Sequence, residues 1–182
     1  MPAAPDEWLD LLRDDGTPSG ERILKADAHR TGAWHRAVHI WIVTPGRRVL
    51  LQRRAAVKEN YPSLWDVSCA GHCSAGESAT EAAVRELAEE LGLAVDPVDL
   101  QPLGSIREQC VLNGGKYVDH ELHDLFLLRR DVDLDALVLQ PEEVDDVALV
   151  PIDELRARVE ARDPSLVPPA PEEYALLWNG AV

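Results

Sequence analysis

The sequence has no long apolar run, few aromatic residues and few cysteines. Its 182 residues include three cysteines and one phenylalanine, and aromatic side chains make up 5% of the chain. An odd, small number of cysteines indicates no disulfide framework. A membrane helix needs about 20 successive apolar residues, and the start MPAAPDEW lacks the positive charge of a signal peptide. We therefore expect a cytoplasmic protein without membrane attachment.

Positive charge is also scarce. The chain has 18 Lys and Arg residues against 33 Asp and Glu residues, which gives a formal net charge of −15. Such a surface repels phosphate backbones, so we expect no stable nucleic-acid binding, although a small phosphorylated ligand can still bind through metal ions. The hydrophobic share of 46% is typical of a globular protein, and the length suits one domain of roughly 100–200 residues.

Turn residues such as Pro45-Gly46 and Asn113-Gly114-Gly115 divide the chain into predicted strands and helices. Strands are predicted over 7–12, 22–25, 35–44, 47–54, 66–70, 98–109, 117–129 and 144–150, and helices over 77–91, 152–161 and 172–178. Their irregular alternation predicts an α/β protein with a mixed sheet covered by helices on both faces. We expect one domain over 1–182, with a core at about 34–162, N-terminal strands in 1–33, and a proline-rich linker and C-terminal helix in 163–182.

The predicted helix over 77–91 places three carboxylates on one face. Glu86, Glu89 and Glu90 stand at positions i, i+3 and i+4, within one helical turn. Like charges this close repel one another and raise some of the pKa values. A divalent cation such as Mg²⁺ or Mn²⁺ relieves the repulsion, because these ions prefer carboxylate oxygens. The alternative is a solvated acidic helix face.

The segment GHCSAGESATEAAVRELAEELGL, residues 71–93, resembles the Nudix box, the signature of the Nudix hydrolases. The matching positions are Gly71, Glu77, Arg85, Glu86, Leu87, Glu89, Glu90, Gly92 and Leu93, each at the motif's spacing. The resemblance implies an α/β/α sandwich with a mixed β-sheet. It also implies hydrolysis of the diphosphate linkage between a nucleoside diphosphate and a group X, which the motif does not identify. Dimers are common in this family, so a homodimer is one expected assembly.

The resemblance also implies a role for each motif position. Glu86, Glu89 and Glu90 become the ligands of the Mg²⁺ or Mn²⁺ cofactor, which neutralises the diphosphate and acidifies an attacking water. Arg85, which we place among the catalytic residues with Glu86 and Glu90, braces the segment together with Glu77. At the two ends of the segment, Gly71 and Gly92 allow tight backbone geometry.

The reaction also needs a general base. Glu86 is one candidate, and the best candidate outside the box is Glu121 in VDHELHDLF, which we also predict to be a metal ligand. Asp119 shares the face of Glu121 if this segment is extended, whereas Asp124 is a weaker candidate. His120 and His123 flank Glu121.

Three cationic side chains precede the box. Arg53, Arg54 and Lys58 stand out in an acidic protein and are candidate contacts for the substrate phosphates. The alternative is that they lie on a solvated strand end.

Residues 20–150 are similar to the isopentenyl-diphosphate isomerase-like branch of the Nudix proteins, mainly through HRAVHIWIVTPGRRVLLQRRAAVKENYPSLWDVSCAGHCSAGES. That isomerase uses a Cys and a Glu for proton transfer and holds a metal with His and Glu residues. The positions that look like this second metal site are His29, His35, His72, Asp119 and Glu121. The resemblance therefore adds a possible histidine site to the glutamate site of the box.

The position before the box glycine argues against an isomerase. The isomerase carries its Cys there, whereas this chain has Ala70. The adjacent Cys69 would point to the opposite face of a strand. The isomerase also loses part of the glutamate set that this chain keeps. We therefore expect hydrolysis of a small-molecule diphosphate, with an isomerase and a catalytically silent ligand-binding protein as alternatives.

Overall fold

The computed structural model describes residues 7–181, so residues 1–6 of the predicted N-terminal range and residue 182 lie outside the described part. The strands are β1 (Trp8–Leu12), β2 (Pro18–Leu24), β3 (His35–Val43), β4 (Arg48–Arg54), β5 (Trp65–Asp66), β6 (Cys69–His72), β7 (Leu100–Leu112), β8 (Tyr117–Arg129) and β9 (Val144–Pro151). The helices are α1 (Lys25–Thr31), α2 (Ala79–Leu91), α3 (Ile152–Glu160) and α4 (Pro171–Gly180). Short 3-10 turns lie at η1 (Pro97–Asp99), η2 (Asn113–Gly115) and η3 (Leu134–Ala136).

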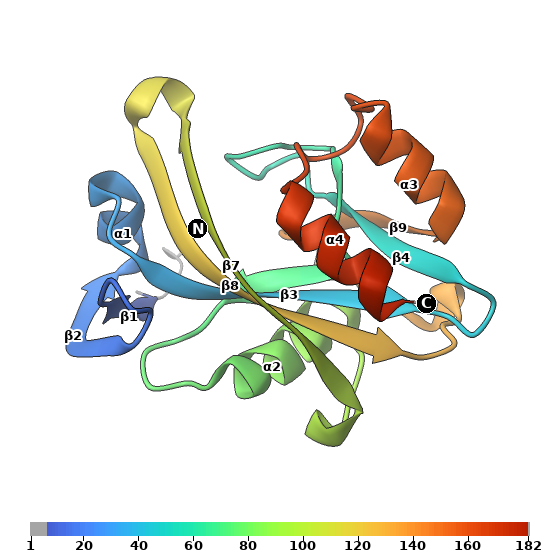
Figure 1. The fold of residues 1–182 in the computed structure, drawn as a ribbon, viewed down its shortest axis with the longest axis horizontal. Helices are drawn as coiled ribbons and strands as arrows, with labels where there is room; N and C mark the ends of the chain where they lie inside the picture. The colour runs from blue at the N-terminus through green and yellow to red at the C-terminus, as the bar shows by residue number, and fades with distance from the viewer. Residues whose placement is uncertain (1–6, 182) are drawn as a thin grey trace.

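The main sheet is mixed, as the sequence predicts. Its strand order is β5-β4-β3-β8-β7, with β6 paired to the first half of β3 and β9 paired to β4. β3 and β8 run parallel, and the other pairs in this sheet are antiparallel. Helix α2 lies against one face, while α3 and α4 lie against the other (Figure 1). This arrangement confirms the predicted α/β class with helices on both faces.

Helix α2 begins where a side chain caps it. Ser78 is extended, with φ −77° and ψ 157°, and its hydroxyl accepts a hydrogen bond from the Glu81 amide while the Glu81 carboxylate accepts one from the Ser78 amide. This capping box starts the helix at Ala79, two residues later than predicted. Gly92 ends the helix in the left-handed region with φ 67°, as its position predicts.

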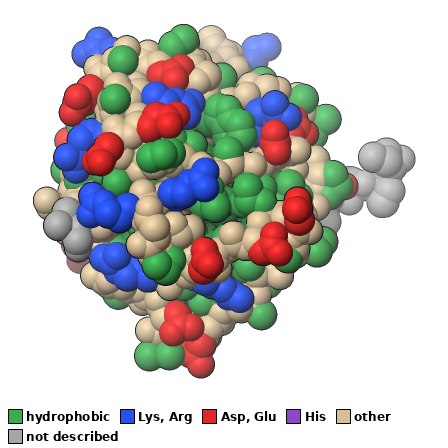
Figure 2. Space-filling view, turned by 90° about the vertical axis from the view of Figure 1, so that its right-hand side faces the viewer, with side chains coloured by type: hydrophobic (Ala, Val, Ile, Leu, Met, Phe, Trp, Pro, Cys, Tyr) green, Lys and Arg blue, Asp and Glu red, His purple; other side chains and the backbone are tan. Residues whose placement is uncertain are grey.

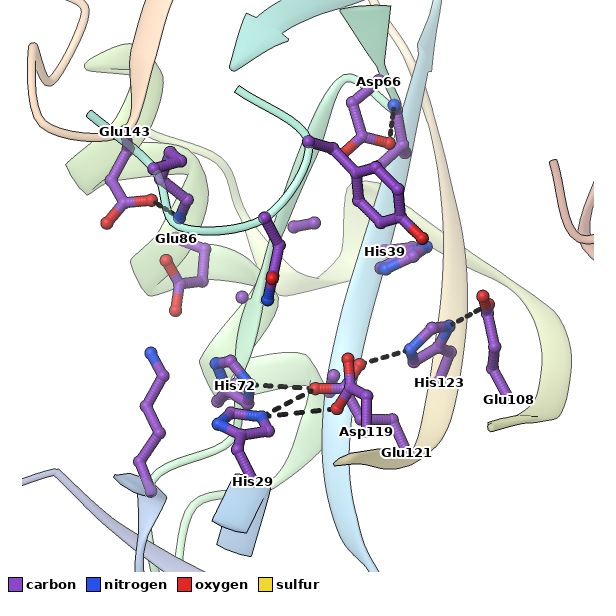
Figure 3. Close-up of a pocket in the computed structure, with 18 of the residues that line it drawn as sticks. His29, His39, Asp66, His72, Glu86, Glu108, Asp119, Glu121, His123 and Glu143 are labelled. Carbon is purple, nitrogen blue, oxygen red and sulfur yellow. Dashed lines mark hydrogen bonds and ion pairs between the residues drawn. The ribbon is translucent and has the colours of Figure 1, made fainter. Parts of the chain in front are cut away.

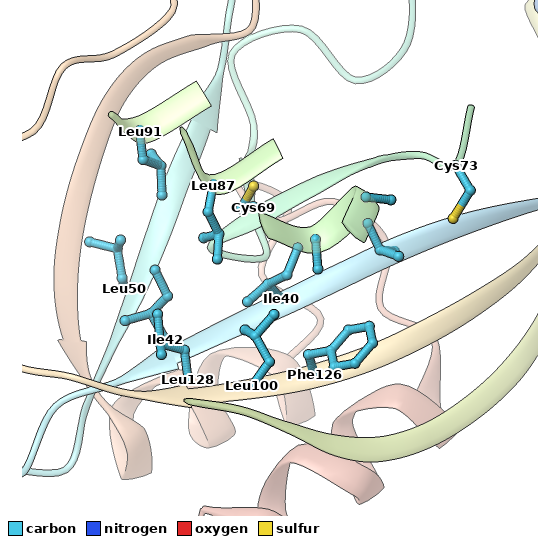
Figure 4. Close-up of a cluster of buried hydrophobic side chains, with 13 residues drawn as sticks. Ile40, Ile42, Leu50, Cys69, Cys73, Leu87, Leu91, Leu100, Phe126 and Leu128 are labelled. Atoms are coloured by element: carbon cyan, nitrogen blue, oxygen red, sulfur yellow. The ribbon is translucent and has the colours of Figure 1, made fainter. Parts of the chain in front are cut away.

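The face of the sheet beneath α2 is apolar. Leu87 and Leu91 of α2 are fully buried against Ile40 and Ile42 of β3 and Leu128 of β8 (Figure 4). Burying a leucine or isoleucine side chain contributes about 1.5–3 kcal/mol. This packing fixes the helix on the sheet, and it holds Glu86 and Glu90 against β6.

The predicted strand over 66–70 is wrong in one respect, because it divides into β5 and β6. Ser68 lies between them, and its hydroxyl accepts from the Ile42 amide at 2.8 Å and donates to the Leu50 carbonyl at 2.6 Å. The Ser68 hydroxyl thus takes the place of two backbone hydrogen bonds of the sheet. At this residue the chain changes its pairing partner, from β4 for β5 to β3 for β6. Helix α1 was not predicted, since its seven residues have no side-chain N-cap and follow a strand directly.

The opposite face of the sheet packs against the C-terminal helices. Trp41 and Leu127 are buried there with Leu155 of α3 and Leu177 of α4. On the right-hand side of Figure 1, basic side chains are interspersed with acidic ones (Figure 2). Within residues 7–181, no helix has both the length and the apolar content needed to cross a membrane.

Candidate active site and metal centres

The described part of the chain encloses a large cavity of about 1540 Å³. It is lined by side chains from α1, β3, β6, α2 and β8 and by the segment that leads into α4. Among the described strands, β6 pairs with β3 on one side, and its other edge has no neighbouring strand. Residues of α2 that lie beside β6 reach the cavity past this free edge of β6. The cavity therefore joins the glutamates of α2 to side chains on the other face of the sheet.

Two of the three box glutamates lie against β6. Glu86 lines the cavity beside Gly71, where an added Cβ would lie 2.1 Å from the Glu86 carboxyl carbon. Glu90 is 3% exposed, and one of its oxygens lies 3.4 Å from the Ala70 amide nitrogen. Glu89 also lines the cavity but is exposed. The glycine is therefore required by the glutamate carboxylate that occupies its side-chain space.

Burial makes these carboxylates hard to ionise. It raises the pKa of Glu86 to about 7, against the opposing effect of Arg85 and with a further contribution from Glu89. Burial also raises the pKa of Glu90 to about 8, and the nearby charge of Glu86 adds to this effect. A bound divalent cation would replace the missing positive charge, so the pair has the electrostatics of a cation site.

Arg85 connects α2 to the loop that precedes it. Its Nε and Nη2 atoms donate to the two oxygens of Glu77 at 2.9 Å each, and Nη2 also donates to the His72 carbonyl at 2.9 Å. Its Nη1 atom donates to Glu86 at 2.8 Å and to Glu89 at 3.0 Å. One guanidinium thus orients two of the box glutamates and holds the loop, which is the bracing arrangement that the resemblance implies for Arg85 and Glu77.

A second polar cluster is set by strand register. In the parallel pairing of β3 with β8, His35 is opposite Glu121, and in the antiparallel pairing of β3 with β6, Ala37 is opposite His72. His29 comes from α1, which packs on β8. These elements bring together His29, His35, His72 and Glu121, whose ligand atoms all lie within 4.8 Å of one another. We call these four residues the histidine cluster.

Glu121 is the centre of the histidine cluster (Figure 3). Its Oε1 atom lies 2.9 Å from His72 Nε2, 3.1 Å from His35 Nε2 and 3.8 Å from His29 Nε2. Asp119 adds a second carboxylate 3.3 Å from His29 Nε2. Burial alone would raise the pKa of Glu121, but hydrogen bonds from the histidines outweigh it and hold this pKa well below its ordinary value.

The hydrogen bonding of the histidine cluster leaves a gap that a cation fits. His35 Nδ1 donates to the Ala33 carbonyl at 2.9 Å, so in a neutral ring Nε2 presents a lone pair to Glu121. His29 Nε2, His72 Nε2 and Asp119 Oδ1 are buried, and among residues 7–181 they make the close ion-pair contacts given above without the geometry of a hydrogen bond. Nitrogen and oxygen atoms that converge in this way fit a divalent metal ion, which the histidines would bind in their neutral form.

The predicted phosphate contacts divide into two groups. Arg54 and Lys58 line the cavity, where Arg54 Nη1 donates to Asp66 at 2.9 Å and Lys58 pairs with Glu143. Arg53 is not among the described residues that line the cavity. It lies 3.7 Å from Asp146, and its guanidinium is 5.9 Å from the ring centre of Trp65. Strand alternation explains the difference, since neighbouring residues of β4 point to opposite faces.

Sequence reasoning did not select His39 or Glu173, which the structure places in the same cavity as Glu121. His39 did carry a signal, because it stands four residues after His35 and an even spacing on a strand means the same face. Glu173 carried none, since it reaches the cavity from α4 at the far end of the chain.

Ala70 and Cys69 point to opposite faces, as strand alternation predicts. Ala70 lines the cavity, whereas Cys69 is fully buried in the core beneath α2. Burial raises the pKa of the Cys69 thiol well above its ordinary value, and the charge of Glu90 acts in the same direction. Cys69 therefore cannot serve as a proton donor on the cavity side of β6.

Comparison with known proteins identifies the family. Residues 33–169 match the family model of the NUDIX domain. Nudix hydrolase 3 of Arabidopsis thaliana is 38% identical over 166 residues, which are 90% of this chain but only 22% of that protein. The isopentenyl-diphosphate Delta-isomerase of Rhodobacter capsulatus is 35% identical over 146 residues, 80% of each chain. The crystal structure of a Deinococcus radiodurans protein covers 94% of this chain and 98% of its own, with a TM-score of 0.72 at 23% identity.

The fold, the box geometry and the family match together define the class of protein: the chain belongs to the Nudix family. It is a Nudix hydrolase that resembles the isopentenyl-diphosphate isomerase-like branch, and the general activity of such enzymes is the hydrolysis of diphosphate bonds. At 23% identity, the likeness to the Deinococcus structure concerns the fold alone.

Proposed function

We propose that this chain hydrolyses the phosphoanhydride bond of a nucleoside diphosphate linked to a group X, or of a related diphosphate, with Mg²⁺ or Mn²⁺ as cofactor. The observation that carries the proposal is the position of Glu86 and Glu90. Both lie beside β6 at the edge of the cavity, and burial raises both of their pKa values. The fold therefore holds two carboxylates in surroundings with too little positive charge to stabilise their ionised forms.

Glu86, Glu89 and Glu90 would hold the divalent ion, and Arg85 orients Glu86 and Glu89 toward it. When bound, such an ion neutralises the diphosphate and acidifies a water molecule. Gly71 leaves the space that the Glu86 carboxylate occupies. The role of the protein here is to keep three flexible side chains in one arrangement before the substrate binds.

For the general base we favour Glu86 over Glu121. Both oxygens of Glu121 already contact ring nitrogens, since Oε1 lies 2.9 Å from His72 Nε2 and 3.1 Å from His35 Nε2 and Oε2 lies 2.6 Å from His123 Nε2, so little room is left for a water. Within residues 7–181, the side chain of Glu86 accepts a hydrogen bond from the Arg85 guanidinium alone, on its Oε1 atom. We assign Glu121 instead to a second metal site, together with His29, His35, His72 and the nearby Asp119.

Arg54 and Lys58 are the proposed phosphate contacts. Each is now paired with a carboxylate, Asp66 and Glu143 respectively, and each lines the cavity. A diphosphate carries more negative charge than one carboxylate, so it can compete for these cations. We do not propose Arg53 for this role, since it lies near Asp146 and Trp65.

Four further assignments accompany this proposal. We propose that residues 1–182 act as one Nudix domain with its core at about 34–162, in the cytoplasm, on a small molecule rather than a nucleic acid or a membrane. We keep a homodimer as the proposed assembly. Light scattering after gel filtration tests it, and a mass of one chain at micromolar concentration would contradict it.

A substrate panel tests the proposed hydrolysis. The wild type is incubated with nucleoside di- and triphosphates, dinucleotides, coenzyme A and isoprenoid diphosphates in Mg²⁺ or Mn²⁺, and both products are identified by mass spectrometry. We expect metal-dependent cleavage of at least one diphosphate linkage, with loss of that activity in Glu86→Gln. Saturable binding without any product would instead indicate a silent ligand-binding protein.

An isomerase is the second candidate, because the histidine cluster lies where the isomerase branch is expected to hold its metal. The residue before the box glycine opposes it, since Ala70 provides no proton donor and the Cys69 thiol faces the core. Deuterium exchange into isopentenyl diphosphate tests this candidate directly. We expect no exchange by the wild type, and exchange without phosphate release would replace hydrolysis as the assigned activity.

A further inference from the structure

A further group of potential metal ligands lies in the same cavity, on the other side of Glu121 from the histidine cluster. His39 of β3, His123 of β8 and Glu173 of α4 place one ligand atom each within 4.8 Å of the others. We call these three residues the His39 triad. The rings of His39 and His123 are 4.1 Å apart between centroids, and His39 Nδ1 lies 3.0 Å from both oxygens of Glu173.

We propose that the His39 triad binds its own divalent transition-metal ion, of the Zn²⁺ type, separate from any ion held by α2 or by the histidine cluster. Two imidazoles and one carboxylate form a ligand set that zinc takes in open sites, where a water or a ligand fills the fourth position. Mg²⁺ would not favour this set, because it prefers oxygen ligands. All three side chains line the cavity, so the fourth position is accessible from it.

The surroundings of the His39 triad resemble the outer shell of a metal site. Glu173 is 5% exposed, and the Trp41 indole donates to its Oε1 atom at 2.9 Å, which fixes the carboxylate. His123 is 4% exposed, and its Nε2 lies 2.6 Å from Glu121 Oε2. Histidines that bind metals usually donate their other ring nitrogen to a carboxylate in this way.

One buried atom remains unexplained without an ion. His123 Nδ1 has no hydrogen-bond partner within residues 7–181, and the nearest carboxylate, Glu108, lies 3.6 Å away in a position visible in Figure 3. An ion pair between a protonated His39 and Glu173 would account for their contact, but it would leave this nitrogen unsatisfied. A buried nitrogen without a partner is costly, and a metal ion bound by this nitrogen would remove that cost.

Glu121 links the His39 triad to the histidine cluster. Its Oε1 atom faces His35 and His72, whereas its Oε2 atom contacts His123. The same carboxylate is therefore positioned between two sites on one face of the sheet. Since Glu173 belongs to α4, an ion in the His39 triad would also fasten the C-terminal helix to β3 and β8.

Anomalous diffraction tests the proposal on the wild type. Crystals of chelator-treated protein are soaked in Zn²⁺, and data are collected on both sides of the zinc absorption edge. We expect a peak about 2.0–2.2 Å from ligand atoms of His39, His123 and Glu173. A map with a peak at the histidine cluster and none at the His39 triad would overturn this inference and leave the proposed function intact.

Metal stoichiometry gives an independent test in solution. After dialysis against submicromolar Zn²⁺, zinc per chain is measured by mass spectrometry for Glu173→Gln and His39→Gln. The matched controls are Glu172→Gln, an exposed neighbour on α4, and His120→Gln, a histidine of β8 outside both groups.

We expect one zinc ion fewer per chain in the two triad variants and no change in the controls. The double variant His39→Gln/His72→Asn is expected to lose two ions, which separates the two sites. Circular dichroism checks that each variant is folded. Unchanged stoichiometry in both folded triad variants would overturn the proposal, and if the variants do not fold, the diffraction result on the wild type decides.

Discussion

The carboxylates of α2 and the carboxylate of Glu121 lie in one cavity but have opposite electrostatics. Burial raises the pKa of Glu86 to about 7 and that of Glu90 to about 8. Glu121 is buried as well, yet hydrogen bonds from the surrounding histidines hold its pKa well below the ordinary value. The difference lies in the neighbours, because Glu90 has mainly another carboxylate near it and Glu121 has imidazoles on both of its oxygens.

This contrast indicates two kinds of metal chemistry in one cavity. The α2 group offers only oxygen ligands, which suit Mg²⁺ or Mn²⁺ bound together with a substrate phosphate. The histidine cluster offers nitrogen as well as oxygen, which suits ions of the Mn²⁺ to Zn²⁺ range. Removing a carboxylate from the first group should impair chemistry while sparing the fold, whereas removing Glu121 should impair the fold.

The largest expected effect is that of Glu90→Gln on turnover. Glutamine keeps the size of the side chain but cannot supply a charged oxygen to a cation, so we expect kcat to fall by roughly three orders of magnitude. The measurement is product release at saturating Mg²⁺ with the best substrate of the panel. Glu160→Gln, an exposed glutamate at the end of α3, is the matched control and should keep full activity.

The fold of Glu90→Gln should remain intact. In the metal-free protein the pKa of Glu90 is raised above its unfolded value, so ionising Glu90 costs stability as the pH rises from about 4.5 through about 8. Removing the ionisable group removes that cost. We therefore expect the metal-free variant to be at least as stable as the wild type at pH 9, and a Tm well below wild type would contradict this view of α2.

Glu121→Gln should show the reverse pattern. The substitution removes the carboxylate that contacts the ring nitrogens of His35 and His72, and it leaves His29, whose pKa Asp119 and Glu121 raise to about 9 against the effect of burial, with Asp119 alone. Removing one partner of a buried charged group costs about 3–5 kcal/mol. Urea unfolding of the metal-free protein measures this loss, with the exposed Glu142→Gln as control. A change below 1 kcal/mol would mean that Glu121 is not the electrostatic centre of the cluster.

The same two regions show how far the sequence alone could lead. The α2 group was predictable because its geometry is local: the spacing of Glu86, Glu89 and Glu90 fixes one helix face, and Gly92 fixes where the helix ends. The mixed sheet was also predictable, because strand patterns and turn residues can be recognised in the local sequence. The start of α2 differed by two residues because the Ser78 cap, not the acidic composition, decides it.

The histidine cluster depends on tertiary arrangement. Family resemblance pointed to its members, but only the pairing of His35 with Glu121 across β3 and β8, and the unpredicted helix α1 that carries His29, bring them together. Nothing local to Glu173 indicates that it enters the cavity, because α4 reaches β3 from more than a hundred residues away. Arg53 and Arg54 look equivalent in sequence until the face of β4 is known.

Gly71→Ala should sharpen the comparison through a smaller effect. Its Cβ would lie 2.1 Å from the Glu86 carboxyl carbon and 2.6 Å from Cγ, so the end of a flexible side chain must move while the backbone can stay. A displacement of about 1 Å at a catalytic group can cost about 10²-fold in rate. We expect that loss in kcat with little change in Tm. Gly46→Ala, where the nearest atom is 3.8 Å away, should alter neither quantity.

The last expected effect is the pH dependence of Mg²⁺ binding. Mg²⁺ must displace the protons of Glu86 and Glu90, whose pKa values are about 7 and about 8, so affinity should rise with pH and level off above about 8. Each displaced proton contributes at most about a tenfold change in affinity per pH unit. Isothermal titration calorimetry in buffers of different ionisation enthalpy counts the protons released. Glu90→Gln should release fewer protons at pH 6.5 than the wild type. An affinity independent of pH between 6 and 8 would show that Mg²⁺ binds elsewhere, and the contrast between α2 and Glu121 would then have no consequence for catalysis.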